Sequence, residues 1–364
     1  MFYNEGEVKK MSNFDALKHY IMPSDVLMDM LDLYRILGMN AEYQKKLDAQ
    51  SVYLKQAVIE RDTFYVASLL SVEISDHRLR LLITKNVVPK NKEEQLVLGI
   101  KKVVRLIQDR SAEKYPFNGS ELLEYLNIIY GKNSHRFSTA LYEKEEVEKR
   151  MSVRLALEKM FETYHEYHQE KWFEPIFLSV IAYMEVINIK AFSKNNELAG
   201  ILALYYMLLR LDVLSFRYVS FFEIYAQYKK ELDTAVARGS ISYKESYLST
   251  TDTVRLVFEM IRQSYIEIEK MIKNFTHLES AYKSDIIEET ILKKMPTYFT
   301  KEEVRRLHPD ASDATIHRVL FKLRDEQLIM PLGKGRSARW MKLISDQDPR
   351  ILFGGHYEAT SDKD

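Results

Sequence analysis

Residues 174–209 read EPIFLSVIAYMEVINIKAFSKNNELAGILALYYMLL, two apolar runs joined by a short polar segment. The runs, Trp172 to Ile189 and Leu198 to Leu211, are apolar almost all round, and helices without a polar face belong at the centre of a bundle. The segment between them, Lys190 to Glu197, joins two helices that should be buried. Such a loop is a place where a bundle can hold a ligand, and a solvated connection is the alternative.

Helices are predicted on both sides of this stretch, because 11 Gly and 8 Pro are few among 364 residues and apolar residues recur mostly at spacings of three and four. Ser120 is the expected cap of a helix that runs to Ile129. Other expected helices lie within 25–110 and at 140–171, 217–237 and 244–275, the second of these as a solvated surface helix. The fold class is therefore mainly α.

The pattern changes near residue 283. Glu303 stands three residues after Thr300, which is the spacing of a capping box at the start of a short helix. The expected elements are helices at Ile286–Lys294, after Thr300 and after Ser312, and strands at Leu328–Met330 and Arg339–Leu343. Three short helices followed by a hairpin predict a winged helix–turn–helix.

Composition excludes several kinds of protein. The chain has no Cys, which excludes disulfide scaffolds, thiol catalysis and zinc ribbons and fits a reducing compartment. The start, MFYNEGEVKK, lacks the apolar core of a signal peptide. The longest uncharged apolar run, Leu198 to Leu209, is shorter than the about 20 residues that span a membrane. We therefore expect a cytoplasmic protein with no membrane partner.

Charge is unevenly distributed. The 53 Lys plus Arg balance 53 Asp plus Glu over the whole chain, but residues 283–344 hold 13 basic and 9 acidic residues. Basic side chains on the third helix and the wing of a winged helix are candidates for contacts with duplex DNA. These candidates are Thr315, His317, Arg318 and Lys322 on the helix and Lys334, Arg336 and Arg339 on the wing. A packing role is the alternative, because Asp313 and Asp325 lower the charge of the helix.

The quoted stretch resembles the core of Fic-domain proteins, whose signature HPFxxGNGRxxR lies between two central helices. The similarity extends over residues 60–343, and a terminal winged helix is a common companion of such domains. The resemblance implies transfer of AMP from ATP to a protein hydroxyl. It assigns the signature His as the base, an acidic residue as the Mg²⁺ ligand, and the Gly, Asn and Arg residues to the phosphates. Many Fic proteins are homodimers, so the resemblance also suggests a homodimer.

Most of the signature is replaced in this chain, which keeps Phe192 and Asn196. The replacements, in order, are Lys190 and Ala191 for His-Pro, Lys194 for the acid, Asn195 and Glu197 for the glycines, and Leu198 and Ile201 for the arginines. A lysine cation is a poor base and repels Mg²⁺, and Glu197 puts a carboxylate where phosphates should lie. We therefore predict a degenerate Fic domain with no catalytic residue, no cofactor and a vestigial ligand loop at Lys190 to Glu197.

Two other features of the sequence are candidate sites. Many Fic proteins carry an inhibitory helix with the pattern [S/T]xxxE[G/N], and Leu69 to Ser75 keeps only its glutamate, Glu73. Glu73 is thus a candidate inhibitory position, with an ordinary surface glutamate as the alternative. His165 and His168 have the i, i+3 spacing of metal ligands, but no third ligand is evident and we assign no metal.

Three functions remain open. The first is a catalytically silent regulatory or binding protein that contacts duplex DNA. The second is a Fic-class transferase that moves AMP or another phosphate-bearing group, with ATP and Mg²⁺, and the third is a structural module that binds a protein partner. The expected domains are an N-terminal helical region (1–110), a Fic-like bundle (111–282), the winged helix (283–344) and a flexible tail (345–364).

Overall fold

The structure is a computed structural model, and it describes residues 14, 17, 20–85, 87–113, 117–141, 151–171, 173–211, 213–244, 248–308, 311–333 and 338–343. The predicted tail and the wing residues Lys334 and Arg336 lie outside these residues. The chain divides into two compact units, Met1–Glu269 and Lys270–Asp364. The boundary predicted after residue 110 lies inside the first unit, and the boundary predicted after residue 282 lies inside the second.

The described part of the first unit is built from α-helices, so the mainly α fold class is confirmed. They are α1 (Ser24–Leu37), α2 (Asn40–Leu47), α3 (Ser51–Leu69), α4 (Asp76–Thr84), α5 (Lys92–Ala112), α6 (Gly119–Tyr130), α7 (Val153–Glu170), α8 (Pro175–Ile189), α9 (Asn196–Arg210), α10 (Phe221–Gly239) and the first part of α11 (Thr251–Glu289), which ends in the second unit. Short 3₁₀ turns, η2 (Asp48–Gln50) and η3 (Leu214–Arg217), lie before α3 and α10.

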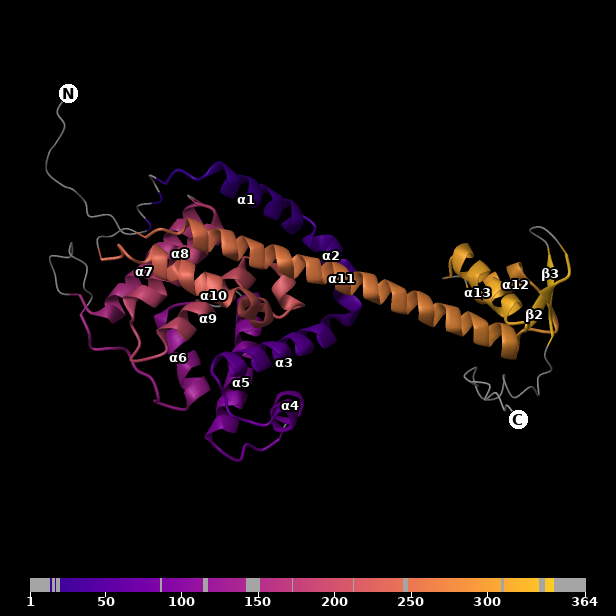
Figure 1. Ribbon diagram of the computed structural model, residues 1–364, viewed down its shortest axis with the longest axis horizontal. Coiled ribbons are helices and arrows are strands. Elements are labelled where there is room, and N and C mark those ends of the chain that lie inside the picture. Colours follow the sequence, from indigo (N-terminus) through magenta and orange to yellow (C-terminus); the bar gives the residue numbers. More distant parts are fainter. Residues whose placement is uncertain are drawn as a thin grey trace, which may run out of the picture. The chain divides into compact units, whose positions relative to one another are not determined.

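Helices α8 and α9 form the centre of the first unit. Glu174 caps α8 by accepting hydrogen bonds from the amides of Ile176 (2.9 Å) and Phe177 (2.5 Å). Every residue of α9 from Ala199 to Leu209 is buried. The two helices pack side by side, with α7 against α8 and α5 against α9 (Figure 1). The two apolar runs of the sequence are therefore central helices, as predicted.

A buried polar network joins α3, α5, α9 and the start of α10. The carboxylate of Asp62 in α3 is fully buried and accepts hydrogen bonds from the Tyr205 hydroxyl (2.8 Å), the Ser220 hydroxyl (2.6 Å) and the Phe222 amide (3.0 Å). Gln108 of α5 donates to the same Tyr205 hydroxyl at 2.6 Å. Burial raises the pKa of Asp62 to about 6, although the three hydrogen bonds oppose that shift. The network ties four helices to one ionisable group.

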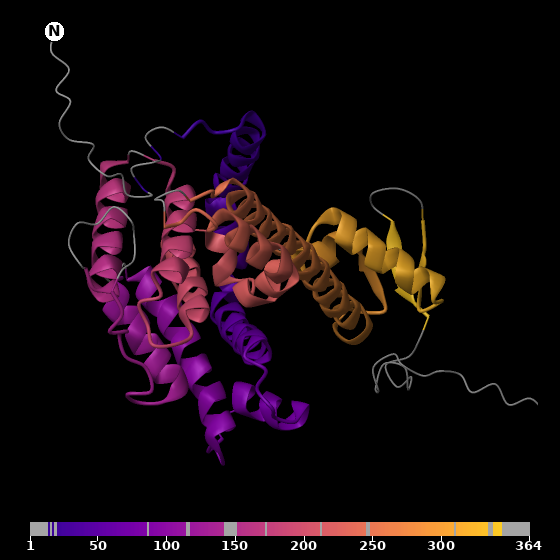
Figure 2. The ribbon, with the colours of Figure 1, turned by 60° about the vertical axis from the view of Figure 1, so that its left-hand side comes forward.

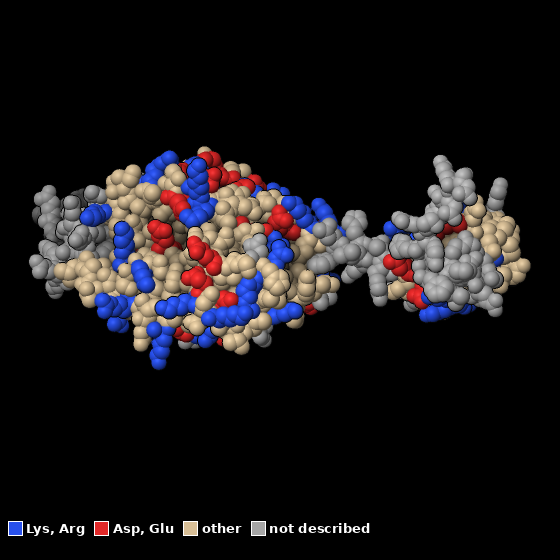
Figure 3. Space-filling model, turned by 60° about the horizontal axis from the view of Figure 1, so that its bottom comes forward, with Lys and Arg blue, Asp and Glu red and all other residues tan. Residues whose placement is uncertain are grey.

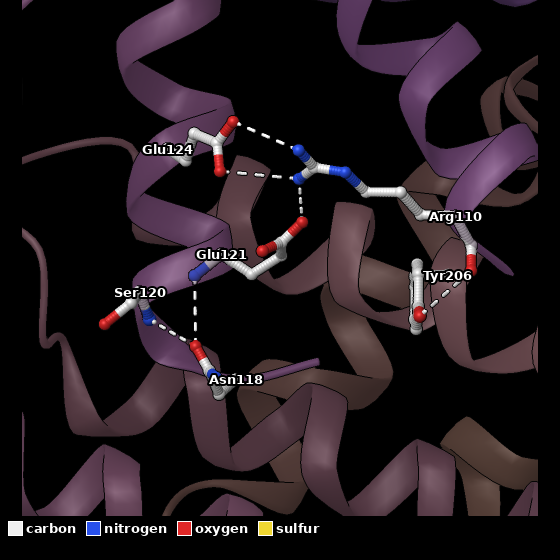
Figure 4. Close-up of polar contacts among 6 residues, drawn as sticks. All are labelled: Arg110, Asn118, Ser120, Glu121, Glu124 and Tyr206. Atoms are coloured by element: carbon white, nitrogen blue, oxygen red, sulfur yellow. Dashed lines mark hydrogen bonds and ion pairs between the residues drawn. The ribbon is translucent and has the colours of Figure 1, made fainter. Parts of the chain in front are cut away.

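The start of α6 differs from the prediction. The capping residue is Asn118, whose Oδ1 accepts hydrogen bonds from the amides of Ser120 (2.9 Å) and Glu121 (3.2 Å) (Figure 4). Ser120 lies in the first turn of the helix and was wrongly predicted as its cap. Asn and Ser are equally good caps, so the sequence pattern did not distinguish the two positions.

Arg110 connects α5 to α6 and α9. Its guanidinium pairs with Glu121 and lies 3.3 Å from a carboxylate oxygen of Glu124, both in the first half of α6 (Figure 4). The Tyr206 hydroxyl of α9 donates to the carbonyl oxygen of Arg110 at 3.5 Å. Glu121 is buried and Arg110 is half-buried, so the pair fixes α6 against α5 rather than lying free on the surface.

A solvated helix was predicted at 140–171, but the helix found there, α7, is partly buried. It begins at Val153, after a cap in which Ser152 Oγ accepts the amide of Leu155 at 3.2 Å. One face of the helix is buried, through Phe161 and Tyr164 among others. The charged residues of α7 itself are exposed or half-buried.

The second unit contains the end of α11, a π-turn, two short helices and a small sheet (Figure 2). These elements are η4 (Thr290–Lys294), β1 (Tyr298–Thr300), α12 (Lys301–Leu307), α13 (Asp313–Asp325), β2 (Ile329–Pro331) and β3 (Arg339–Lys342). All strand pairs are antiparallel in the order β1-β3-β2, with Phe299 and Pro331 opposite Trp340 on either side. Helix α11 replaces the two helices predicted at 244–275 and 286–294.

Both predicted caps of the second unit are confirmed. Thr300 and Glu303 form a reciprocal capping box at α12, and Ser312 Oγ accepts the amide of Thr315 at 3.1 Å at α13. The apolar core between helices and sheet includes Ile287, Ile291, Phe299, Val304, Ile316, Val319, Leu320, Leu323, Ile329 and Trp340. Strand β1 was not predicted, and the winged-helix assignment stays a prediction.

Candidate functional site

The loop between α8 and α9 is closed by the side chain of Asn196. Its Nδ2 donates to the carbonyl oxygen of Phe192 at 2.9 Å, and its Oδ1 accepts the amide of Phe192, also at 2.9 Å. Both ends of the side-chain amide are therefore used inside the loop. Asn196, one of the two retained signature residues, thus holds the backbone of Phe192, the other.

Phe192 anchors the loop to a second segment of the chain. Its side chain is buried and stacks on the ring of Phe137, with the ring centroids 5.6 Å apart. The two residues form an isolated antiparallel bridge, and the amide of Ser138 donates to the carbonyl oxygen of Ala191 at 2.8 Å. Phe192 is thus a packing residue that joins the loop to residues 136–138.

A histidine that the sequence did not indicate reaches the loop. Asn195 has a left-handed backbone (φ 58°), and its Nδ2 lies 3.0 Å from Nε2 of His135. An amide nitrogen only donates, so Nε2 accepts and the proton of the neutral ring lies on Nδ1, which is 2.9 Å from the hydroxyl of Ser134. Burial, and then the nearby charge of Lys194, lower the pKa of His135 and favour this neutral form. No sequence motif links two residues 60 positions apart.

The charged residues of the loop point into solvent. Lys190, Lys194 and Glu197 are all exposed. Lys190 ends α8 in a left-handed conformation, and the Lys194 ammonium lies 6.0 Å from the ring centroid of Tyr130. Glu197 lies in the first turn of α9, where a carboxylate interacts favourably with the helix dipole. Within the described ranges, no ion pair engages these three side chains.

Glu73, the candidate inhibitory position, lies outside a helix. It is exposed in the segment between the end of α3 at Leu69 and the start of α4 at Asp76. The inhibitory pattern expects a helical glutamate, so the local structure does not match that pattern.

The two histidines of α7 do not form a metal site with other described residues. His165 Nε2 lies 2.8 Å from the carbonyl oxygen of Phe117, and the ring of His168 stacks on Tyr164 at 6.2 Å. Among the residues that the structure describes, no group of three potential metal ligands occurs.

Two of the predicted DNA-contacting residues on α13 are engaged elsewhere. Thr315 is 9% exposed, and its hydroxyl lies 2.9 Å from the cap hydroxyl of Ser312, so its prediction as a groove-facing residue is wrong. The Lys322 ammonium donates to Glu288 of α11 at 2.7 Å, a hydrogen bond that raises the pKa of Lys322. His317, Arg318 and Arg339 are exposed, and their contact with DNA stays a prediction.

The exposed side of α13 also carries a row of planar groups, which we call the stacked row: His317, Phe321 and Arg324. The rings of His317 and Phe321 are nearly parallel with centroids 5.7 Å apart, and Arg324 Cζ lies 4.5 Å from the centroid of Phe321. The row borders a groove of about 750 Å³ whose other walls include Lys301, Arg305 and Trp340. Phe321 and Arg324 were not predicted, because an exposed Phe on a helix resembles a core residue in sequence.

On the face of the first unit drawn in Figure 3, Lys and Arg side chains are interspersed with Asp and Glu, so the basic and acidic residues do not form separate patches there. No helix in the described ranges combines the length and apolarity that a membrane span requires.

The sequence matches no protein-family model and no curated protein, but its structure resembles solved structures. A Fic family protein from Desulfovibrio desulfuricans G20 is 14% identical with a TM-score of 0.50, and the match covers 89% of this chain and 97% of that chain. A Fic domain containing signaling protein from Bacteroides thetaiotaomicron VPI-5482 is 13% identical with a TM-score of 0.51, over 68% of this chain and 98% of that chain. At this identity the likeness establishes architecture alone. The chain therefore has the fold of Fic-family proteins.

Proposed function

We propose that this chain is a Fic-fold protein without nucleotidyl-transfer chemistry, which acts as a regulatory protein and contacts duplex DNA through residues 283–344. One observation carries the first half of the proposal. The two signature residues that the chain retains, Phe192 and Asn196, are occupied by packing and hydrogen bonds inside the loop. Their retention is explained by the fold and does not require a nucleotide.

The replaced positions oppose transfer chemistry. Lys190 puts an exposed ammonium in place of the signature histidine, and an ammonium has no lone pair with which to accept the proton of an attacking hydroxyl. Lys194 offers a cation in place of a Mg²⁺ ligand. Glu197 adds a negative charge at the start of α9, where the phosphates would have to lie.

His135 does not replace the lost base. Its Nε2 lone pair accepts the Asn195 hydrogen bond, and His135 as a residue is only 3% exposed. A base must reach the proton that it removes, directly or through one water, and this nitrogen is already used and covered. His135 therefore does not supply the base that the transferase alternative needs.

The DNA half of the proposal rests on the second unit. Within it, residues 283–344 hold 13 basic and 9 acidic residues, and Arg318 on α13 and Arg339 on β3 are exposed. Cations that contact phosphates release condensed counterions, which makes binding depend on salt.

We expect the full chain to bind a mixed-sequence duplex at low salt and to lose affinity as salt rises. Arg318→Ala and Arg339→Ala should each reduce the slope of log affinity against log salt by about one. Fluorescence anisotropy of a labelled duplex over a salt series measures this slope. The matched control is Lys229→Ala on α10, which removes the same charge from the first unit and should leave the slope unchanged. Absence of binding at low salt, or an equal effect of the control, would contradict the proposal.

A further inference from the structure

We propose that the stacked row of α13 contacts base edges and sets the sequence preference of duplex binding. This inference rests on the proposed function, because it assigns a role within the same DNA contact. It names Phe321 and Arg324 as base-contacting residues beside His317, in place of Thr315 and Lys322.

The geometry of the row favours contact with consecutive bases. Its members stand at i, i+4 and i+7, and the opposite face of α13 is buried through Ile316 and Val319. The spacings of 5.7 and 4.5 Å compare with a rise of about 3.4 Å per base pair, so the row spans about three base-pair steps. Stacking of the three planar groups also restricts their rotation before any ligand binds, which lowers the entropy cost of binding.

The chemistry of the row matches the edges of bases in the major groove. An arginine pairs bidentately with O6 and N7 of guanine, and an aromatic ring contacts the methyl group of thymine. Arg324 now donates from Nε (2.9 Å) and Nη2 (2.6 Å) to one carboxylate oxygen of Asp325. Both partners of this ion pair are largely exposed, so exchanging it for a base costs little.

The row is an accessible part of α13, as is Arg318. Lys322, on another side of α13, is held by Glu288. Lys301 (3.3 Å) and Arg305 both bind the carboxylate of Asp313 across the neighbouring groove. That groove, of about 750 Å³, lies beside the row, and its walls carry these two cations together with the carboxylates of Glu302 and Asp313. A phosphate that contacts Lys301 or Arg305 there has to replace the carboxylate of Asp313.

The test is selection of bound sequences from a random duplex pool with the full chain, followed by sequencing. The variants are Arg324→Ala and Phe321→Leu, and the control is Arg306→Ala, which removes an equal charge from an exposed position of α12 that does not line the groove. We expect the wild-type chain to enrich a motif and Arg324→Ala to weaken the preference at one position by about tenfold or more. Phe321→Leu should alter the adjacent position, and Arg306→Ala should enrich the wild-type motif. Far-ultraviolet circular dichroism checks that each variant is folded.

The possible results test the base-contact inference and the proposed DNA binding separately. The same motif with the same weights in all variants would overturn the inference and leave duplex binding intact. So would binding of the pool without enrichment of any motif. Failure of the wild-type chain to retain any duplex would contradict the proposed function and the inference together, and would favour a protein partner for the row.

Discussion

Asp62→Ala is expected to destabilise the first unit by about 4 kcal/mol, because three buried donors lose their acceptor at once. These donors are the hydroxyls of Tyr205 and Ser220 and the amide of Phe222. The alanine also leaves a cavity at a site where the carboxylate was fully buried. Urea unfolding followed by circular dichroism at 222 nm measures the loss.

Asp62→Asn is the matched variant, and its effect should depend on pH. Its Oδ1 can still accept from Ser220 and Phe222, while its Nδ2 can donate to the Tyr205 hydroxyl, so its direct cost is about 1 kcal/mol. The pKa of Asp62 is about 6 in the folded chain and 3.8 ordinarily, so the buried group disfavours its ionised form. The free energy of unfolding that Asp62 contributes is therefore highest below about pH 4 and falls by ~3 kcal/mol as the pH rises through 6.

The difference between the two proteins isolates this group, because all other titrations cancel. The stability of Asp62→Asn relative to wild type should rise by about 2.5 kcal/mol between pH 4 and pH 7.5. A difference that stays constant with pH would show that Asp62 ionises in the folded chain as it does in water. A loss below 1 kcal/mol in Asp62→Ala would contradict the structural role of the network.

Gly99→Ala is the second substitution with a large expected effect, a loss of ~3 kcal/mol at the upper end of the range for overpacking. Helix α5 packs closely on α6 at this position. A Cβ at residue 99 would lie 2.5 Å from the carbonyl oxygen of Ile128 and 2.8 Å from the Cα of Ile129. Both neighbours are backbone atoms, so no side-chain rotation relieves the contact and the helices must separate.

Gly38→Ala serves as the control for this substitution. Gly38 follows α1 with a right-handed backbone (φ −60°, ψ −20°) that alanine adopts freely, and its Cβ would lie no closer than 3.3 Å to the carbonyl oxygen of Arg35. We expect Gly38→Ala to be neutral or slightly stabilising. Thermal unfolding of both variants gives the comparison, and equal melting temperatures for Gly99→Ala and wild type would contradict the close packing of α5 on α6.

The central helices could be predicted because their signal is local and strong. The runs of 174–189 and 198–209 are long enough, and apolar enough, to exclude a surface helix. The capping box at Thr300 was found for the same reason, since all of its parts lie within four residues. Helix α11 was divided wrongly because a change of composition near 283 was taken as a boundary, although the helical periodicity continues.

Other features could not be predicted, because the residues that form them are distant in the sequence. Strand β1 has three residues and pairs with β3 some 40 positions later, so no local pattern announces it. Asp62 accepts hydrogen bonds from residues that lie 143 to 160 positions later in the chain. In the candidate site, alignment with the Fic signature identified the retained residues but not their task. Their role in holding the loop follows from the structure, in which Asn196 is hydrogen-bonded to Phe192 and Asn195 lies beside His135.

The central claim is that the loop at Lys190 to Glu197 no longer serves a nucleotide. Calorimetric titration of the full chain with ATP and with ADP, each with and without Mg²⁺, tests it most directly. We predict no saturable heat with either nucleotide and no effect of Mg²⁺, because the loop has the Glu197 carboxylate where the phosphates would lie, Lys194 in place of a Mg²⁺ ligand, and an asparagine that is hydrogen-bonded to Phe192. Saturable, Mg²⁺-dependent binding that is lost in Asn196→Ala would contradict the claim and favour the transferase.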